Sequence, residues 1–452
     1  MDGEDDHEAM SANSGHEDED ESGSAQVVPN HKKQAYLPGK SRDLKDDEEL
    51  TFDKQAYRMY HPFTTERPCL SFDPLMDDDG DNRDSYPLTC RLVAGTQAER
   101  SRDNGLLTMK LANITPIKAK KDDDDDDDES ESEDEEDDEK KAEKTPAMHA
   151  ALIPHQGGVN RIRATRLGAS TVCAVWNDQC KVQIWNLTPA LKAVNEMTDK
   201  KTQSTTLKKE KPLFSFVGHQ SEGFALDWSS VSTGRLASGD NMKRIHVWSM
   251  GEGGQWAVDQ RPLTGHTGSV EDIQWSPTEE NVFASCSADG SIRLWDARAP
   301  AAEACVCTVA NAHDSDVNVI SWNSTEPFLL SGGDDGELKV WDLKLIQYGQ
   351  AVARFKHHSK PITSVQWNPK DSTVFMASGE DDQTTIWDLA LEADDGDETE
   401  KIQTDEPTVP PQLLFIHMGQ EEVKEVRWHR QLTGVALTTA LSGFNIFRTI
   451  NV

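Results

Sequence analysis

Several features that define common protein classes are missing from this sequence of 452 residues. The N-terminus, Met1–Asp6, has neither the basic nor the apolar region of a secretory leader. There is no apolar run of about 18 residues, the length that a membrane-spanning helix needs. The seven cysteines show no disulfide framework, and Cys305 and Cys307 have no further ligands at zinc spacing. We therefore expect no membrane contact, metal or other cofactor, and free thiols in a reducing compartment.

Positive charge is also scarce. The chain has 81 acidic and 46 basic residues, which gives a formal net charge of −35. Nucleic acids and anionic membranes repel such a surface, whereas cationic proteins are drawn to it. The composition therefore predicts basic protein partners and no direct, sequence-specific binding of nucleic acid. The alternative is that the acidity serves solubility alone, but the charge is concentrated in runs rather than spread.

Two of these runs divide the chain. Residues 1–45 form an acidic N-terminal tail that is expected to be disordered, because it has too little apolar surface to bury. Residues 118–146 form an acidic loop, and 16 of the 18 residues from Asp122 to Glu139 are Asp or Glu. Like charges keep such a run extended and solvated, so it can act as a clamp for cationic partners. Its carboxylates include Asp122, Asp128, Glu133 and Glu139, and its two serines, Ser130 and Ser132, are candidate phosphorylation sites.

Four segments of the sequence repeat one pattern. Each begins with a histidine and ends with a tryptophan, which an aspartate follows in three of the four copies. The distance from histidine to tryptophan is 29, 29, 28 and 29 residues. This content is typical of WD repeats, in which units of about 40–45 residues form the four-stranded blades of a β-propeller. The copies are His219–Trp248, His266–Trp295, His313–Trp341 and His358–Trp387.

Weaker copies extend the series on both sides. One contains His155 and Trp185, and the other contains His417 with Phe447 in place of the last tryptophan. Residues 67–117 are expected to supply a closing strand and the first blade, and residues 147–452 the remaining blades. Closing the ring removes open sheet edges, and we expect Cys69–Phe72 to pair with the last blade. The sequence thus predicts an all-β, seven-bladed WD-repeat β-propeller.

The repeats also share a set of polar side chains. Histidine, serine, aspartate and tryptophan can form a buried, hydrogen-bonded chain in each blade. Serine, histidine and aspartate also form catalytic triads, but here the set recurs beside a tryptophan from blade to blade, which favours a structural role and a protein that is not an enzyme. The repeat at Gly218 has Met242 in place of the turn aspartate, so we expect its set to be incomplete. Two complete sets are His266, Ser285, Asp289 and Trp295, and His313, Ser331, Asp335 and Trp341.

A helix is expected ahead of the repeats, within residues 46–66. Acidic residues at Asp46–Glu49 suit the positive end of a helix dipole. The apolar residues that follow recur at spacings of three and four, and Pro62 is expected to end the helix. Its apolar side would contain Phe52, Ala56, Met59, Tyr60 and Phe63.

Motifs outside the repeats resemble those of one known family. They include Tyr36-Leu-Pro-Gly39, Pro68-Cys-Leu-Ser-Phe-Asp73, Glu222-Gly-Phe-Ala-Leu-Asp-Trp228 and the acidic tract. These motifs resemble the glutamate-rich WD repeat-containing family, which is grouped with the histone-binding chaperones of the retinoblastoma-binding type. The resemblance implies a nuclear and nucleolar protein that binds core histones. It also implies a chaperone for the large-subunit ribosomal protein L-three that acts in the assembly of pre-ribosomal particles.

The resemblance further implies where a partner binds. Relatives of the retinoblastoma-binding type hold a histone helix between their N-terminal helix and an acidic loop in a late blade. An apolar floor with carboxylates on its rim suits an amphipathic basic helix. The residues at the matching positions here are Phe52, Ala56, Met59 and Tyr60 on the helix, Asp394, Asp395, Asp397, Glu398, Glu400, Asp405 and Glu406 on the loop, and Leu413 and Phe415 after it.

Two other functions stay open at this point. Trp295-Asp296-Ala297-Arg298 resembles the Trp-Asp-x-Arg motif of substrate receptors in cullin ubiquitin ligases, with Arg298 as the residue that contacts the ligase adaptor. The other is a passive chromatin scaffold, which would bind basic proteins without keeping them soluble.

Overall fold

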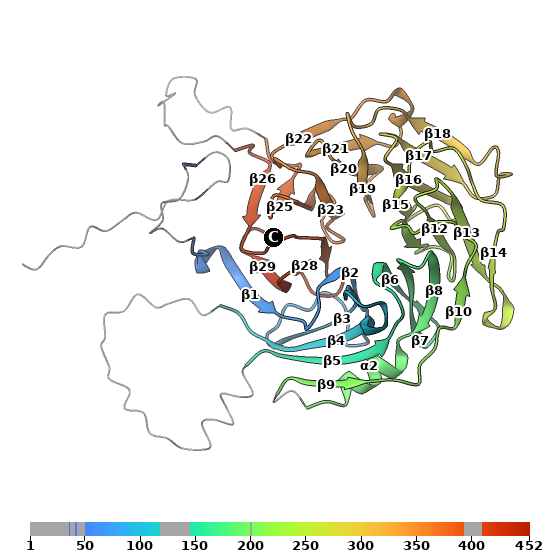
Figure 1. The fold of residues 1–452 in the computed structure, drawn as a ribbon. Helices are drawn as coiled ribbons and strands as arrows, with labels where there is room; N and C mark the ends of the chain where they lie inside the picture. The colour runs from blue at the N-terminus through green and yellow to red at the C-terminus, as the bar shows by residue number, and fades with distance from the viewer. Residues whose placement is uncertain (1–35, 37–40, 43–49, 118–144, 199–200, 393–408) are drawn as a thin grey trace, which may run out of the picture. The chain divides into compact units, whose positions relative to one another are not determined.

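The computed structural model describes residues 36, 41–42, 50–117, 145–198, 201–392 and 409–452. The chain divides into two units, Met1–Leu50 and Thr51–Val452, and the secondary structure described below lies in the second (Figure 1). None of the described helices is long and apolar enough to cross a membrane. Within the described ranges, no group of three or more His, Cys, Asp or Glu residues could hold a metal ion.

Residues 51–452 form seven sheets that are arranged as blades around a central axis (Figure 1). This arrangement confirms the predicted all-β, seven-bladed propeller. Neighbouring strands within the four-stranded part of each blade are antiparallel. The first blade contains β2 (Cys69–Pro74), β3 (Leu88–Thr96), β4 (Gly105–Ile114) and β5 (Ala147–Pro154), the second β6 (Val159–Leu167), β7 (Ser170–Asn177), β8 (Lys181–Asn186) and β10 (Phe214–Phe216), and the third β11 (Leu226–Trp228), β12 (Leu236–Gly239), β13 (Ile245–Met250) and β14 (Trp256–Val258).

The remaining blades follow the same plan. The first strand named in each blade lies nearest the axis, and the last lies at the outer edge except in the first blade, where β9 lies outside β5 (Figure 1). The fourth blade contains β15 (Val270–Trp275), β16 (Val282–Ser287), β17 (Ile292–Asp296) and β18 (Cys305–Val309), the fifth β19 (Val317–Trp322), β20 (Phe328–Gly333), β21 (Glu337–Asp342) and β22 (Ala353–Lys356), the sixth β23 (Ile362–Trp367), β24 (Val374–Gly379), β25 (Thr384–Asp388) and β26 (Leu413–His417), and the seventh β27 (Glu425–Trp428), β28 (Ala436–Ala440), β29 (Gly443–Thr449) and β1 (Tyr57–Phe63).

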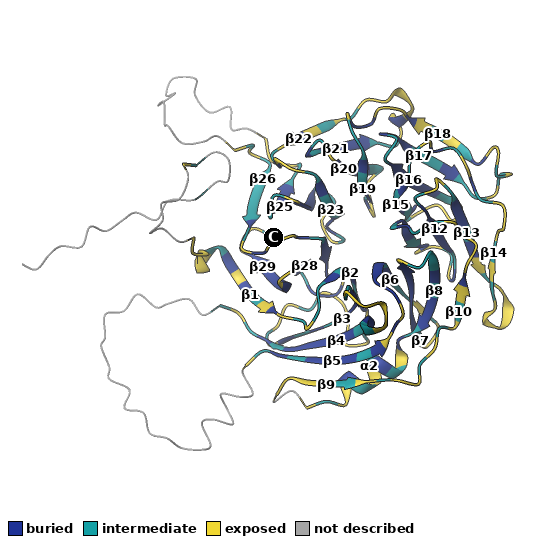
Figure 2. Cartoon of the chain, viewed as in Figure 1, coloured by how far each residue is buried: buried dark blue, intermediate teal, exposed yellow. Residues whose placement is uncertain are grey.

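The core lies between the blades. Their middle strands are buried on both faces, whereas the connecting loops and outer strands are exposed (Figure 2). The repeat tryptophans Trp248, Trp295, Trp341 and Trp387 are fully buried and fill the space between neighbouring sheets. Burial on both faces explains why these strands are rich in apolar and small residues rather than alternating in polarity.

Elements outside the blades are few. The helix α2 (Thr188–Asn195) and the strand β9 (Gln203–Thr206) lie between β8 and β10. β9 pairs in parallel with β5 and gives the first blade a fifth strand. The described 3-10 helices are η1 (Lys54–Ala56), η2 (Ser101–Asp103), η3 (Glu252–Gly254) and η4 (Ile346–Tyr348).

The expected helix within residues 46–66 is wrong over its described part. After the single turn η1, residues Tyr57–Phe63 form β1, which pairs with β29 so that Tyr60 lies opposite Phe447. The apolar residues here are aromatic, and their spacing of three and four does not exclude a strand. Pro62 is tolerated because β1 lies at the edge of its sheet, where one side of the strand needs no ladder partner. Residues 46–49 lie outside the described residues.

Two predicted boundaries also change. The ring is closed by β1, whereas Cys69–Phe72 belongs to β2, the inner strand of the first blade. The first blade continues to β5, so residues 118–144 are an insertion between β4 and β5 of one blade and not a linker between blades. β1 pairs with β29, which lies almost 400 residues later, and β5 pairs with β4 across the insertion. A pattern read over a few neighbouring residues does not report either pairing.

Candidate functional site

The repeated polar side chains form hydrogen-bonded chains inside the blades. In the fourth blade, Nδ1 of His266 lies 3.1 Å from Asp289, and Nε2 lies 2.7 Å from the hydroxyl of Ser285. The indole of Trp295 donates to the same hydroxyl at 2.8 Å. The fifth blade repeats this chain with His313, Asp335, Ser331 and Trp341.

Burial controls the charge of this chain. Burial lowers the pKa of His266, which keeps the imidazole neutral at pH 7. Burial also opposes the charge of Asp289, but hydrogen bonds from His266 and Ser291 outweigh it and hold the pKa of the carboxyl well below its ordinary value. The histidine side chain has no exposed surface. These hydrogen bonds therefore connect the loop before a blade to the two middle strands of that blade, at a position that is shielded from solvent.

The third blade corrects one expectation. Its set is complete, because Asp240 lies 2.9 Å from Nδ1 of His219 and takes the part that we expected Met242 to leave vacant. Asp240 stands directly after β12, one position earlier in its turn than Asp289 does after β16. Ser238 and Trp248 complete the chain at 2.8 and 3.0 Å.

A buried ionic cluster, which no sequence motif indicated, joins three blades. Glu425 on β27 is 1% exposed, and its carboxylate accepts hydrogen bonds from Arg163 at 2.6 Å and Arg161 at 3.1 Å, both on β6. On β2, the hydroxyl of Ser71 and the backbone N–H of Phe72 donate to its other oxygen at 2.7 and 2.9 Å. Burial opposes the charge of Glu425, but these arginines and Arg427 outweigh it and hold the pKa well below the ordinary value.

This cluster lies at the seam where the ring closes. Glu425 belongs to the seventh blade, Ser71 to the first and Arg163 to the second. The partners are more than 260 residues apart in the sequence. We call Glu425 with Arg161, Arg163, Arg427 and Ser71 the seam cluster.

An apolar surface lies on the outer edge of the propeller, where the sixth and seventh blades meet. Phe52 is 48% exposed, and its ring lies 5.1 Å from that of Tyr60. Phe415 on β26 packs edge-on against Tyr57 at 5.0 Å. Ala56, Tyr60, Leu414 and Phe415 pack against one buried cluster, and Phe52 contacts it through the rings of Tyr57 and Tyr60. We define the side patch as Phe52, Ala56, Tyr60, Leu414 and Phe415.

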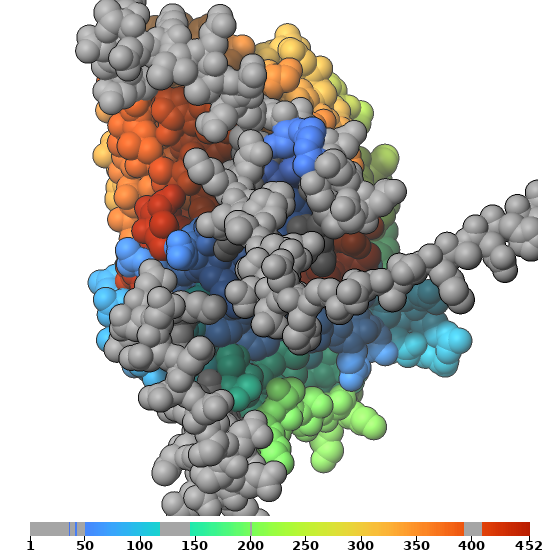
Figure 3. Space-filling model, turned by 90° about the vertical axis from the view of Figure 1, so that its left-hand side faces the viewer, coloured from blue at the N-terminus to red at the C-terminus, as the bar shows by residue number. Residues whose placement is uncertain are grey.

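The side patch rests on a fixed base. The hydroxyl of Tyr57 lies 2.7 Å from Nδ1 of His417, and the other ring nitrogen of His417 lies 3.0 Å from Asn445. Burial lowers the pKa of His417 to about 4, so this base is neutral at pH 7. Figure 3 faces this edge and shows blue residues of the β1 segment beside orange and red residues of the last two blades.

Two acidic sequences are attached beside the side patch. The backbone N–H of Ile117, the last described residue before the tract Asp122–Glu139, donates to the carbonyl of Arg58 on β1 at 2.9 Å. Val409 is the first described residue after the segment 393–408. The N–H of Leu413, at the start of β26, donates to the carbonyl of Pro410 at 3.0 Å. Both insertions therefore begin or end within a few residues of the patch.

The predicted partner-binding residues thus fall into three groups. Phe52, Ala56, Tyr60 and Phe415 come together in the side patch, whereas Leu413 is half-buried and packs against the core between the fifth and sixth blades. Met59 is fully buried and cannot contact a partner, because the strand turns it into the core. Outside the described residues lie Asp394, Asp395, Asp397, Glu398, Glu400, Asp405, Glu406, Asp122, Asp128, Glu133, Glu139, Ser130 and Ser132.

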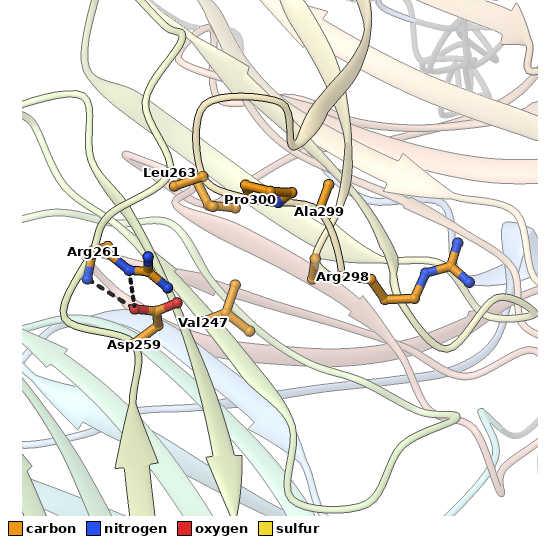
Figure 4. Close-up of a pocket in the computed structure, with 9 residues that line it drawn as sticks. Val247, Asp259, Arg261, Leu263, Arg298, Ala299 and Pro300 are labelled. Atoms are coloured by element: carbon orange, nitrogen blue, oxygen red, sulfur yellow. Dashed lines mark hydrogen bonds and ion pairs between the residues drawn. The ribbon is translucent and has the colours of Figure 1, made fainter.

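Arg298 lies at a second surface feature, a cavity between the third and fourth blades (Figure 4). The cavity is lined by Val247 on β13, by Asp259 and Arg261 after β14, and by the loop that follows β17. Arg298 is exposed and binds the carboxylate of Asp296 with two nitrogens, at 2.9 and 2.6 Å. Its guanidinium points away from the Asp259–Arg261 pair in Figure 4 and stays accessible.

Family models match two parts of the chain. The model described as "Histone-binding protein RBBP4", which also covers the corresponding component of the CAF1 complex, matches residues 47–115. The model described as "WD domain, G-beta repeat" matches residues 258–296, 304–342 and 349–388. Among solved structures, the WD40 beta propeller domain of Doa1 covers 87% of this chain and 96% of its own length, with a TM-score of 0.54 and 16% identity, a likeness that shows the fold alone.

Whole-length relatives are more specific. Protein HEAT STRESS TOLERANT DWD 1 of Arabidopsis thaliana is 43% identical and covers 95% of this chain and 94% of its own. Ribosome assembly protein rrb1 of Schizosaccharomyces pombe is 38% identical over 96% and 87% of the two chains. Glutamate-rich WD repeat-containing protein 1 of Dictyostelium discoideum is 41% identical over 90% and 83%. These matches confirm the resemblance found in the motifs: the chain belongs to the family of glutamate-rich WD repeat-containing proteins.

Proposed function

We propose that this protein is a nuclear and nucleolar chaperone that binds strongly basic proteins and supports their assembly into ribosomes and chromatin. Its clients would be the large-subunit ribosomal protein L-three, delivered to pre-ribosomal particles, and core histones. The name of the Schizosaccharomyces pombe relative supports a role in ribosome assembly, and the histone-binding model over residues 47–115 supports histones as partners. The net charge of −35 accounts for the preference for basic partners.

The observation that carries this proposal is the side patch, beside which two acidic sequences begin or end at Ile117 and Val409. An amphipathic helix can lay its apolar face on Phe52, Tyr60 and Phe415 while its basic face meets carboxylates of the two acidic sequences. Each exposed ion pair contributes only about 0–1 kcal/mol, so many of them together give a salt-sensitive hold with little sequence specificity. The apolar contact then fixes where the client helix lies on the propeller, and the acidic sequences attract the basic client.

Phe52 is the residue whose replacement tests the patch. The variant Phe52→Ala is expected to weaken binding of a histone or L-three segment about 10-fold, because truncating an aromatic anchor costs about 1–2 kcal/mol at an interface. Binding is measured by fluorescence anisotropy at moderate salt. Tyr348→Ala is the matched control, since Tyr348 is an exposed aromatic side chain on the fifth blade, 68% accessible and not part of the patch. Equal affinities of the two variants would contradict the proposal.

The same variants separate a chaperone from a passive scaffold. A chaperone keeps a basic client in solution when the two are mixed in equal amounts, and Phe52→Ala should lose part of that effect. A passive scaffold binds the client but leaves its sedimentation unchanged. Centrifugation of the client with and without the protein distinguishes these outcomes.

One observation favours a second candidate function, that of a substrate receptor for a cullin ligase. Arg298 in Trp295-Asp296-Ala297-Arg298 is exposed and held by Asp296, and the Arabidopsis thaliana relative carries "DWD" in its name. Under this proposal, Arg298→Ala abolishes co-purification of the ligase adaptor from cells. Arg261→Ala, across the same cavity, should not affect it. Retention of the adaptor by Arg298→Ala would remove the candidate.

A further inference from the structure

The inner strands of the propeller share a position that normally links neighbouring blades. At this position, directly before the tryptophan of strands β11, β15, β19 and β23, a side chain accepts a hydrogen bond from the backbone of the next blade. Asp73 on β2 does the same. The bonds are 2.5–3.0 Å long, from Ala164 to Asp73, Trp275 to Asp227, Trp322 to Gln274, Trp367 to Ser321 and Trp428 to Gln366.

Two blades depart from this rule, because they have an arginine at the shared position and arginine cannot accept a hydrogen bond. Arg163 uses its guanidinium within the protein, on Glu425, Ser71 and a carbonyl of its own strand. Arg427 is different. One of its nitrogens contacts Glu425 at 3.1 Å, but Nε has no partner although the residue is only 9% exposed. A buried guanidinium with an unmatched donor costs free energy, and an acceptor supplied from outside would offset that cost.

Arg427 lines a cavity at one mouth of the central channel. The cavity has an empty volume of about 1230 Å³ and is walled by Trp275, Trp322 and Trp367 of three successive blades. Arg430 stands at its rim, exposed, with no hydrogen bond or ion pair to any other described residue. The cavity therefore contains two guanidinium groups in a chain of net charge −35.

A second buried donor in the same wall is also unmatched. The indole N–H of Trp275 has no partner, although the residue is buried. The equivalent indoles of Trp228, Trp367 and Trp428 donate to carbonyls of the preceding blade at 2.9, 3.0 and 3.2 Å. Trp275 and Arg427 therefore both line this cavity, and each has a buried donor that no described group accepts.

Asp227 is the acidic residue among those that line the cavity. Burial raises its pKa to about 7, with Arg163, Asp272 and Arg427 as the charged groups that face it. Near neutral pH the carboxyl is therefore partly protonated, so it only partly offsets the two arginines. The charge of the cavity becomes more positive as the pH falls from 8 to 6.

We propose that this channel cavity is a binding site for an oxyanion, a phosphate or carboxylate group held by Arg427 and Arg430 with the indole N–H of Trp275. The site is separate from the side patch and would take an acidic ligand where the patch takes basic clients. The group could belong to a small phosphorylated molecule or to an acidic peptide. Both offer the same acceptor oxygens to the unmatched donors.

Calorimetry on the full chain at low ionic strength tests the site, with sulfate as a probe whose charge is constant between pH 6 and 8. We expect saturable binding of one anion. Arg427→Gln should weaken it at least 10-fold, and Arg430→Gln and Trp275→Phe about 3- to 10-fold each. Arg261→Gln, in the cavity between the third and fourth blades, is the matched control and should bind as the unmodified protein does.

Because Arg427 also contacts Glu425, its variant could lose stability, whereas Arg430 has no structural partner. An effect of Arg430→Gln with unchanged thermal unfolding therefore supports the site without this ambiguity. Binding should also be tighter at pH 6 than at pH 8, and Asp227→Asn should abolish that difference. Inorganic phosphate and a peptide of Asp122–Asp128 then distinguish the two ligand sources by affinity. Absence of sulfate binding, or equal binding by Arg430→Gln, Trp275→Phe and the control, would overturn the proposal.

Discussion

Replacing Glu425 by alanine is expected to lower the free energy of unfolding by about 3–5 kcal/mol, which is a large part of the stability of an ordinary domain. The reason is the seam cluster. Arg161, Arg163 and Arg427 lie around one buried carboxylate and would lose their counter-charge together. The bonds from Ser71 and Phe72, which hold the first blade to the seventh, would be lost as well. Thermal and urea unfolding of the purified variant measure the effect.

Glu422→Ala is the control for this prediction. Glu422 lies three residues away, is 60% exposed and pairs with Lys424 at 3.1 Å, so its loss should cost no more than about 1 kcal/mol. The variant Glu425→Gln adds a pH test. Since the pKa of Glu425 in the folded protein is below the ordinary 4.5, its stabilisation is present above that pH and is lost as the pH falls below it. The difference between Glu425→Gln and the unmodified protein should therefore shrink on acidification, and a difference that grows would contradict the assignment.

Met59→Ala is expected to destabilise the protein by about 2–5 kcal/mol. The side chain of Met59 is 0% exposed and packs among Phe63, Phe72 and Phe444, so its truncation leaves a cavity beside the strand that closes the ring. Arg58→Ala is the control in the same strand. Arg58 is exposed, and its side chain makes one long hydrogen bond, at 3.3 Å. Its replacement should change stability by less than about 0.5 kcal/mol.

This comparison also tests the assignment of β1. A strand places Met59 and Arg58 on opposite faces, whereas a surface helix with an apolar stripe would tolerate Met59→Ala as readily as Phe52→Ala. Amide hydrogen exchange gives an independent reading, because the residues of β1 that pair with β29 should exchange slowly. Equal and small losses for the Met59 and Arg58 variants would show that the closing strand is not as described.

The two sets of variants answer different questions about the same segment. Phe52→Ala should leave stability nearly unchanged and weaken client binding, since Phe52 lies on the surface. Met59→Ala should do the reverse. Residues that are neighbours in one apolar pattern of the sequence thus divide into a binding group and a core group, and only the pairing of β1 with β29 separates them.

The sequence by itself determined the blades, because each blade is a local unit. The spacing of 28–29 residues from histidine to tryptophan spans one chain of hydrogen bonds within a single sheet, as His266, Ser285 and Trp295 show. Seven such units predict a propeller before any contact is known. The net charge likewise predicts basic partners without reference to the fold.

Tertiary structure alone decided the features that join distant segments. Met59 is in the core because β29, almost 400 residues later, pairs with its strand. Glu425 can be recognised as part of an ionic cluster only once the fold brings it beside arginines of the second blade. Substitutions inside a repeat can also be compensated from another position, as Thr385 on β25 shows by replacing the usual serine between His358 and Trp387. Ring closure places β1 beside β29, and a pattern read over a few residues cannot report contacts between segments that the whole fold makes neighbours.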